Sequence, residues 1–155
     1  MYVEGDATSP SAPGPKIIVH VCNDIGKWGK GFVLAISKRW KAPEQTYKAA
    51  FTSAGGLSLG EVQFVPVTDA IVVANLVGQH GVATRTSTTP PVRYEAIESG
   101  LRKVCDRARA NGALVHMPRI GCGLAGGDWS KVESIVRATL ADVGIQVTVY
   151  DFVAA

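Results

Sequence analysis

The segment 117–129 places the tightest constraint on how this chain folds, because it concentrates glycines between two patterned stretches. An apolar run at 113–117 precedes them and an amphipathic segment at 132–140 follows. The glycines are Gly121, Gly123, Gly126 and Gly127. This pattern predicts a buried strand, a loop and a helix in direct succession.

The expected helix start at Ser130 favours an anion close to the loop. Ser130 and Glu133 fit a capping box, in which each side chain satisfies a backbone N–H without a partner. Glycine lets the backbone approach a ligand closely, and free N–H groups at a helix N-terminus attract negative charge. We therefore expect a phosphate here. The alternative is that the glycines only turn a tight corner.

The succession of strand, glycine loop and helix occurs a second time near the N-terminus. A β-branched run at 16–22 predicts a buried strand, and 23–31 is a second glycine-rich loop. The helix that follows is expected to bury Phe32, Ile36 and Trp40, which recur every four residues on one face.

The rest of the chain alternates between strand and helix patterns. Further strands are expected at 1–4, 61–67, 70–77 and 145–152, and further helices at 43–54, 93–110 and 130–143. Pro66 places the 61–67 strand at a sheet edge. The polar stretch 78–92 is long enough to be a functional or mobile loop. This alternation predicts an α/β fold with a largely parallel sheet covered on both faces.

Both glycine loops follow strand ends, and this predicts a shared cleft. Ligands of parallel sheets bind outside the carboxyl ends of the strands. If the strands at 16–22 and 113–117 are neighbours, their loops face each other. Two backbone anion sites suit a pyrophosphate, so the pattern predicts a phosphorylated, nucleotide-like ligand.

Composition narrows the class of protein. A chain of 155 residues is the usual size of one domain, so we expect a single domain over 1–155. A net charge of +3 with mixed signs falls short of a dedicated nucleic-acid binder. Cys22, Cys105 and Cys122 lack metal-ligand spacing, so we expect free thiols and neither metal nor cofactor. With no leader and no membrane span, a soluble cytoplasmic monomer is expected.

Three motifs resemble those of the macrodomain family, whose members bind ADP-ribose. The first-loop motif is Gly-Asp-Ala-Thr at 5–8, the distal-ribose loop runs from 20 to 31, and the phosphate loop is Pro-Arg-Ile-Gly-Cys-Gly-Leu at 118–124. The phosphate loop resembles that of one branch, which contains the terminal ADP-ribose-protein glycohydrolase and the macrodomain of a chromatin remodeller. The resemblance implies a three-layer α/β/α fold with a mixed, mostly parallel sheet. It also implies ADP-ribose and ADP-ribosylated proteins as partners, as in the DNA damage response.

The resemblance also implies roles for individual residues. Asp6 would accept a hydrogen bond from the adenine amino group, and Phe152 would pack against the adenine ring. The phosphate loop would offer backbone N–H groups to the pyrophosphate. The implied ligand-binding residues are Asp6, Ala7, Asn23, Gly29, Gly31, Phe32, Gly121, Cys122, Gly123, Leu124, Ala125 and Phe152. Alternatively, Asp6 caps a turn, Phe152 belongs to the core, and Arg119 only ties loop to loop by pairing with a carboxylate.

Two positions depart from the glycohydrolase of that branch. Gln79 and Ala125 stand where its nucleophilic lysine and assisting aspartate are expected. A glutamine amide cannot form the covalent intermediate that the lysine forms with the sugar, and an alanine methyl group cannot move a proton. A lysine-dependent mechanism is therefore not expected. Hydrolysis by water needs a base and charge stabilisation. The candidate catalytic residues are Asp128 and Asp24, with His80 or the ligand's own phosphate as further possibilities.

Each ionisable candidate also has a structural interpretation. Asp128 could cap the helix that follows it, Asp24 could brace a glycine turn, and His80 could face solvent. Our leading hypothesis is a lysine-independent ADP-ribosyl hydrolase acting on glutamate- and aspartate-linked ADP-ribose. The alternatives are a reader that binds ADP-ribose or poly-ADP-ribose without turnover, and a phosphatase acting on ADP-ribose 1″-phosphate.

Overall fold

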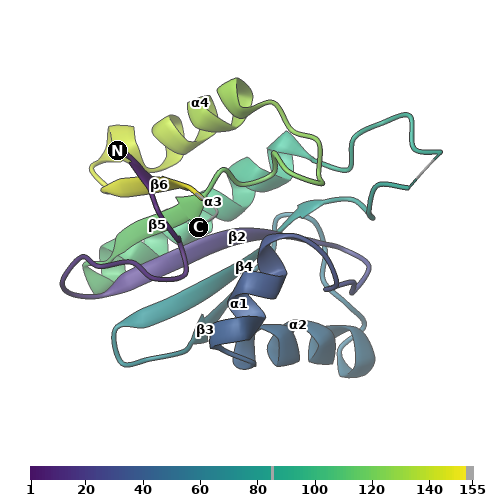
Figure 1. The fold of residues 1–155 in the computed structure, drawn as a ribbon, viewed down its shortest axis with the longest axis horizontal. Coiled ribbons are helices and arrows are strands. Elements are labelled where there is room, and N and C mark those ends of the chain that lie inside the picture. The colour runs from purple at the N-terminus through teal and green to yellow at the C-terminus, as the bar shows by residue number, and fades with distance from the viewer. Residues whose placement is uncertain (85, 153–155) are drawn as a thin grey trace.

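A six-stranded sheet runs through the middle of the molecule, with helices on both of its faces (Figure 1). The computed structural model describes residues 1–84 and 86–152. Its strands are β1 (Tyr2–Glu4), β2 (Lys16–Asn23), β3 (Val62–Pro66), β4 (Ile71–Gln79), β5 (Leu114–Pro118) and β6 (Val147–Asp151). Its helices are α1 (Phe32–Arg39), α2 (Ala42–Ser53), α3 (Tyr94–Asn111), α4 (Trp129–Thr139) and the short 3-10 helix η1 (Ala141–Val143).

The strand order is β1-β6-β5-β2-β4-β3, and only the β3–β4 pair is antiparallel. The mixed, mostly parallel α/β sheet is therefore confirmed, with β3 at an edge as Pro66 predicts. β2 and β5 are neighbours, and Ile17 of β2 lies opposite Val115 of β5. The two glycine loops consequently leave the sheet at the same edge.

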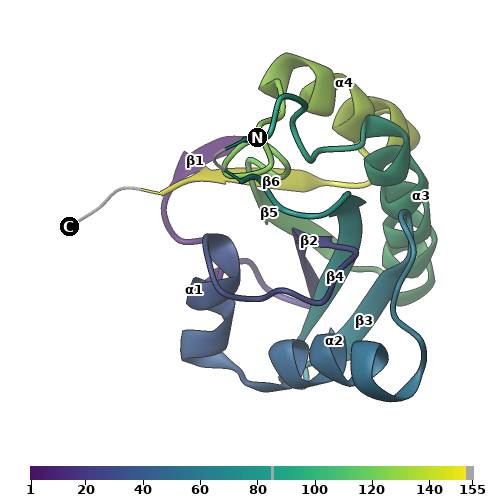
Figure 2. The ribbon, with the colours of Figure 1, turned by 90° about the vertical axis from the view of Figure 1, so that its right-hand side faces the viewer.

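Two hydrophobic cores lie on opposite faces of the sheet because side chains alternate along each strand. Ile17 and Val19 of β2 pack in the larger core beneath α3 and α4. Ile18 points to the other face, where it packs with Ile36 of α1 and Tyr47 of α2. Figure 2 shows the two helix pairs on either side of the sheet. This confirms the three-layer arrangement.

The start of α4 differs from the prediction. Asp128, not Ser130, is the N-cap residue, and its carboxylate accepts a hydrogen bond from the N–H of Ser130 at 2.9 Å. Glu133 does not complete a capping box, because its carboxylate accepts the hydroxyl of Tyr2 from β1. The predicted helix 130–143 also divides, since α4 ends at Thr139 and η1 follows.

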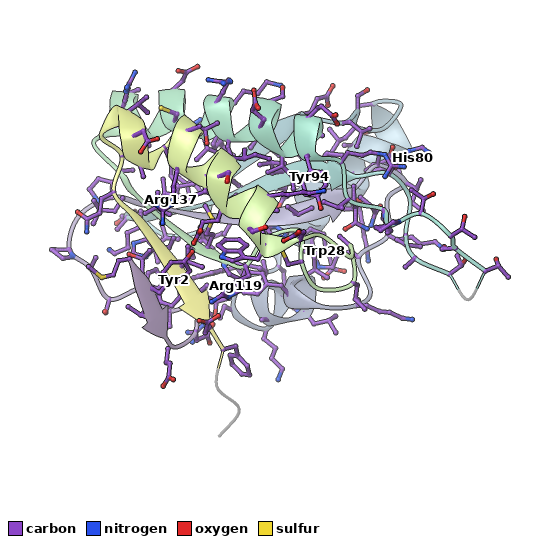
Figure 3. The ribbon with its side chains drawn as sticks, turned by 90° about the horizontal axis from the view of Figure 1, so that it is seen from above. Tyr2, Trp28, His80, Tyr94, Arg119 and Arg137 are labelled. Carbon is purple, nitrogen blue, oxygen red and sulfur yellow. The ribbon has the colours of Figure 1, made fainter. Side chains whose placement is uncertain are left out.

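Two other local predictions need correction. Trp40 lies just past the end of α1 as its C-cap residue with an extended backbone, and both Trp40 and Phe32 are only half-buried, although they pack with Ile36 against the same core as predicted. The loop predicted at 78–92 is shorter than expected, because Gly78 and Gln79 still belong to β4 and Gln79 forms an isolated bridge with Val92. The His80 N–H donates to Pro91 O and the Arg93 N–H donates to Gly78 O. The segment after His80 then projects from the body of the molecule (Figure 3).

The predicted free cysteines are confirmed, with Cys22 and Cys105 buried and Cys122 half-buried. Among the described residues, no helix combines the length and apolarity needed to cross a membrane.

Burial of His20 on β2 predicts a pH-dependent stability. Its Nε2 donates to Asn75 Oδ1 at 2.6 Å, and burial lowers the pKa of His20 from 6.5 to about 4. Between these values the unfolded chain binds a proton that the folded chain does not, so the free energy of unfolding decreases as the pH falls. Urea unfolding should show wild type losing about 2–3 kcal/mol more than His20→Gln between pH 7 and pH 4.5.

The comparison with His20→Gln isolates this histidine. His116, whose pKa is also lowered by burial, is present in both proteins and cancels, as do the carboxylates. Stability curves that stay parallel from pH 7 to pH 4.5 would contradict the prediction.

Candidate functional site

Three pockets lie side by side along the edge of the sheet where the parallel strands end. The first pocket, of about 300 Å³, is lined by residues from the ends of β1 and β6 and the start of α1. The middle pocket, of about 420 Å³, lies between the two glycine loops. The end pocket, of about 580 Å³, lies beyond Leu124 and reaches the segment 82–84.

The three pockets form one groove because neighbouring pockets share lining residues. Gly31, Phe32 and Pro118 line both the first and the middle pocket. Leu124 and Gln79 line both the middle and the end pocket. The groove therefore runs from the end of β6, between the glycine loops, to the end of β4.

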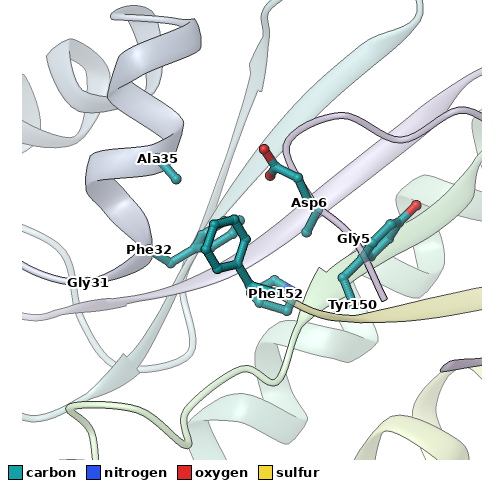
Figure 4. Close-up of a pocket in the computed structure, with 9 residues that line it drawn as sticks. Gly5, Asp6, Gly31, Phe32, Ala35, Tyr150 and Phe152 are labelled. Carbon is teal, nitrogen blue, oxygen red and sulfur yellow. The ribbon is translucent and has the colours of Figure 1, made fainter. Parts of the chain in front are cut away.

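The first pocket offers a carboxylate and aromatic rings (Figure 4). Asp6 Oδ1 accepts the N–H of Thr8 at 2.8 Å and its hydroxyl at 2.7 Å, so Asp6 does cap a turn while also lining the pocket. Burial would raise the pKa of Asp6, but the Thr8 hydrogen bonds and Arg39 outweigh burial and lower that pKa. Phe152 is 76% exposed, so it is not part of the core, and it lines the first pocket together with Phe32.

The middle pocket contains the phosphate loop, which folds on itself by backbone hydrogen bonds. The N–H of Gly127 donates to Gly121 O at 2.8 Å, and that of Gly126 donates to Gly123 O at 3.1 Å. Within the described residues, the N–H groups of Gly121, Gly123 and Leu124 have no protein acceptor. The loop thus keeps backbone donors available for an anion.

The glycines of this loop divide into two kinds. At Gly127 an added Cβ would lie 2.4 Å from Gly121 O, and Gly121 itself has φ +73°. Gly121 and Gly127 are therefore required by the turn itself, which agrees with the alternative that the glycines only turn a tight corner. At Gly123, and likewise at Gly29 in the other glycine loop, φ is ordinary and an added Cβ would meet nothing within 4 Å. The fold does not need glycine there, which leaves room for a ligand against the backbone.

The end pocket is bordered by the second glycine loop, which Asn23 holds in shape. Asn23 Oδ1 accepts the N–H groups of Ile25 at 3.0 Å and Lys27 at 3.1 Å, and the Tyr47 hydroxyl lies 2.7 Å away. Asn23 Nδ2 donates to Lys27 O at 2.6 Å. The side chain of Asn23 is thus largely used within the loop, and its backbone borders the pocket.

Asp24 and His80 form a pair beside the end pocket. His80 Nδ1 lies 2.7 Å from Asp24 Oδ2, and the Gly81 N–H donates to Asp24 Oδ1 at 2.8 Å. Burial would raise the pKa of Asp24, but these hydrogen bonds outweigh it and lower that pKa. Asp24 therefore does brace a turn, as one interpretation predicted. The His80 side chain is 63% exposed, but it is held by its hydrogen bond to Asp24. Neither side chain lines the pocket, although their neighbours Gln79 and Val82 do.

Asp128 lies apart from this groove. It lines none of the three pockets, and both the N–H and the hydroxyl of Ser130 donate to its Oδ1, at 2.9 and 2.7 Å. The structure therefore brings Asp24 and His80 together and leaves Asp128 at the helix cap.

Most implied ligand-binding residues line the groove. Cys122 is the exception, because its N–H points to Arg119 O at 3.4 Å and its thiol to Ile120 O. Sequence reasoning missed Tyr150 in the first pocket and Lys27 and Lys30 in the end pocket. The two lysines lie on either side of Trp28 and Gly29 in the predicted loop, and their place in that loop is the sequence signal that could have identified them.

Comparison with known proteins agrees with this architecture. A solved structure of a macrodomain protein from Streptomyces coelicolor is 54% identical and superposes with a TM-score of 0.84, covering 97% of both chains. The mouse chromodomain-helicase-DNA-binding protein 1-like is 35% identical over 97% of this chain, which spans 17% of that protein's length. The bovine ADP-ribose glycohydrolase OARD1 is 25% identical, over 96% of this chain and 89% of its own. A family model described as Macro domain matches residues 19–136, through both glycine loops, and the chain therefore belongs to the macro domain family.

Proposed function

We propose that the chain binds ADP-ribose along the groove and hydrolyses it from acidic side chains of modified proteins. The observation that carries the proposal is the pair of glycines, Gly29 and Gly123, that the fold does not require and that border adjoining pockets of the groove. The bovine relative's name, ADP-ribose glycohydrolase, supports a hydrolytic activity.

The chemistry of the three pockets gives the ligand one direction. The ionised Asp6 accepts hydrogen bonds only, which suits the amino group of adenine, and the Phe32 and Phe152 rings suit its faces. The free N–H groups at Gly123 and Leu124 suit the pyrophosphate. The distal ribose, with the modified side chain attached, then occupies the end pocket.

The end pocket supports an acidic acceptor. No carboxylate lines it among the described residues, whereas Lys27 and Lys30 do line it and form no ion pair with any described residue. Two ammonium groups at this position would stabilise a carboxylate as it leaves the ribose. This chemistry favours glutamate- and aspartate-linked ADP-ribose.

In the proposed reaction, water attacks the anomeric carbon of the distal ribose and the ester bond to the carboxylate breaks. The carboxylate leaves as an anion and needs no acid, so the step requires one base for the proton of water. Both carboxylate oxygens of Asp24 already accept hydrogen bonds, so Asp24 acts through His80 as a positioning residue. Asp24 accepts a hydrogen bond from His80 Nδ1–H, which leaves His80 Nε2 as the base that takes the proton of water. Gln79, whose Nε2 donates to Gly81 O, keeps its carbonyl oxygen for the water.

Binding is tested at Gly123. In Gly123→Glu the added Cβ meets no protein atom within 4 Å and Gly123 lines the middle pocket, so the fold should persist while the carboxylate repels the pyrophosphate. Calorimetric titration should show ADP-ribose affinity at least about 100-fold weaker than wild type. Gly123→Gln, which has the same size without charge, should lose less affinity. Equal affinity for all three proteins would contradict the proposed position of the pyrophosphate.

Hydrolysis is tested with proteins that carry labelled ADP-ribose on glutamate or on serine. Wild type should release label from glutamate only, because a serine alkoxide leaves poorly. Asp24→Asn and His80→Gln should each lower kcat by about 100-fold, while the ADP-ribose Kd changes less than about twofold. The control Asp142→Asn changes an exposed carboxylate on η1 and should keep full activity.

Other results of this assay separate the alternatives. ADP-ribose binding without label release from glutamate would make the domain a reader. A wild-type rate in His80→Gln would assign the base to the phosphate of the ligand.

The role of Asp128 is tested by exchanging the cap. Asp128→Ser keeps a capping side chain, so the melting temperature and the hydrolysis rate should both stay close to wild type. Asp128→Ala should melt about 2–4 °C lower. If Asp128→Ser kept its melting temperature but lost hydrolysis, Asp128 would be a catalytic residue.

A further inference from the structure

The guanidinium of Arg119, at the start of the phosphate loop, is fixed in place on several sides. Its Nε lies 2.6 Å from Asp151 Oδ1 and its Nη2 lies 3.1 Å from Asp151 Oδ2, so the two groups meet fork to fork. It also lies over the rings of Tyr2 and Trp129, at 5.2 and 5.3 Å from their centroids. Figure 3 shows Arg119 beside Tyr2.

The aromatic side of this cluster is itself held by hydrogen bonds. Trp129 Nε1 donates to the Tyr2 hydroxyl at 3.0 Å, and that hydroxyl donates to Glu133 of α4. The two rings meet edge to face at 6.4 Å. Arg119 therefore has a defined orientation even though its side chain is 41% exposed.

Asp151 connects this cluster to the first pocket. Its backbone carbonyl accepts the N–H of Gly5 at 2.9 Å, and Gly5 leads directly into Asp6. Its side chain accepts Arg119, and the next residue is Phe152, which lines the first pocket. Within the described residues, Asp151 makes no other side-chain hydrogen bond, whereas the preceding Tyr150 is held separately, with its hydroxyl 2.9 Å from His116 Nδ1.

We propose that Arg119 is a positioning residue that sets adenine specificity: through Asp151 it holds Phe152 and Asp6 in register with the phosphate loop. This inference rests on the proposed function, because it requires ADP-ribose to lie with adenine in the first pocket. Arg119 also lines the middle pocket. Direct binding of the pyrophosphate is the competing role, but Nε and Nη2 are already used by Asp151.

The consequence is a separation between two parts of the ligand. Breaking the Arg119–Asp151 pair frees Phe152 and the start of the first loop, so it weakens the binding of adenine. The free N–H groups of the phosphate loop remain, because that loop is closed by its own Gly127–Gly121 hydrogen bond. Affinity should therefore fall for ligands with adenine and stay constant for ligands without it.

The experiment is calorimetric titration of wild type, Arg119→Gln, Arg119→Lys and Asp151→Asn with ADP-ribose and with ribose 5-diphosphate, which lacks adenosine. Each variant should bind ADP-ribose about tenfold more weakly and ribose 5-diphosphate as wild type does. Lysine should not rescue, because it cannot form the two parallel hydrogen bonds. Adding Phe152→Ala to Asp151→Asn should cause no further loss. Arg102→Gln, which removes an exposed arginine paired with Glu98 on α3, is the matched control.

The outcomes distinguish this inference from the proposed function. Equal weakening for both ligands would assign Arg119 to the pyrophosphate, and unchanged ADP-ribose affinity in Asp151→Asn would remove the coupling; either result overturns the inference and keeps the proposed function. Wild type that does not bind ADP-ribose would overturn both.

Discussion

The parallel pairing of β2 with β5 is the constraint on which the rest of the structure depends. It places the carboxyl ends of both strands at one edge of the sheet, so their glycine loops face each other across the middle pocket. β4, β6 and β1 run in the same direction and end at the same edge. The first and end pockets are therefore extensions of the same groove, built from strand ends that lie far apart in the sequence.

Hydrogen bonds within the loops decide which backbone groups remain for a ligand. The loop after β2 is closed by the Asn23 side chain, and the loop after β5 by the bond between Gly127 and Gly121. In the loop after β5 this closure leaves the N–H groups of Gly121, Gly123 and Leu124 without a protein acceptor among the described residues. Such preorganisation lowers the entropy that binding costs.

Local patterns in the sequence predicted the strands and helices well, because the periodicity of apolar residues that defines each element lies within a short stretch of chain. The strands before both glycine loops, the helix predicted at 93–110 and the edge position of β3 all agree with the structure. For the start of α4 the sequence offered two caps, Ser130 and Asp128, and the structure confirms Asp128. The capping box predicted for Ser130 and Glu133 is wrong, because the Glu133 carboxylate accepts the Tyr2 hydroxyl instead.

The parts of the site that the sequence could not predict are contacts between distant residues. Asp24 was predicted as a catalytic candidate, but its pairing with His80 spans 56 residues and follows from strand order. Arg119 was expected to reach some carboxylate, and which one became clear only when β6 was placed beside β5. Phe152 could have been core or surface, because its exposure depends on where the last strand ends.

A crystal structure of the protein with ADP-ribose tests the central claim most directly. We expect electron density for adenine between Phe32 and Phe152, for the pyrophosphate at the N–H groups of Gly123 and Leu124, and for the distal ribose in the end pocket beside Gly29. Density for the ligand outside the groove, or with adenine in the end pocket, would contradict the proposed direction of binding.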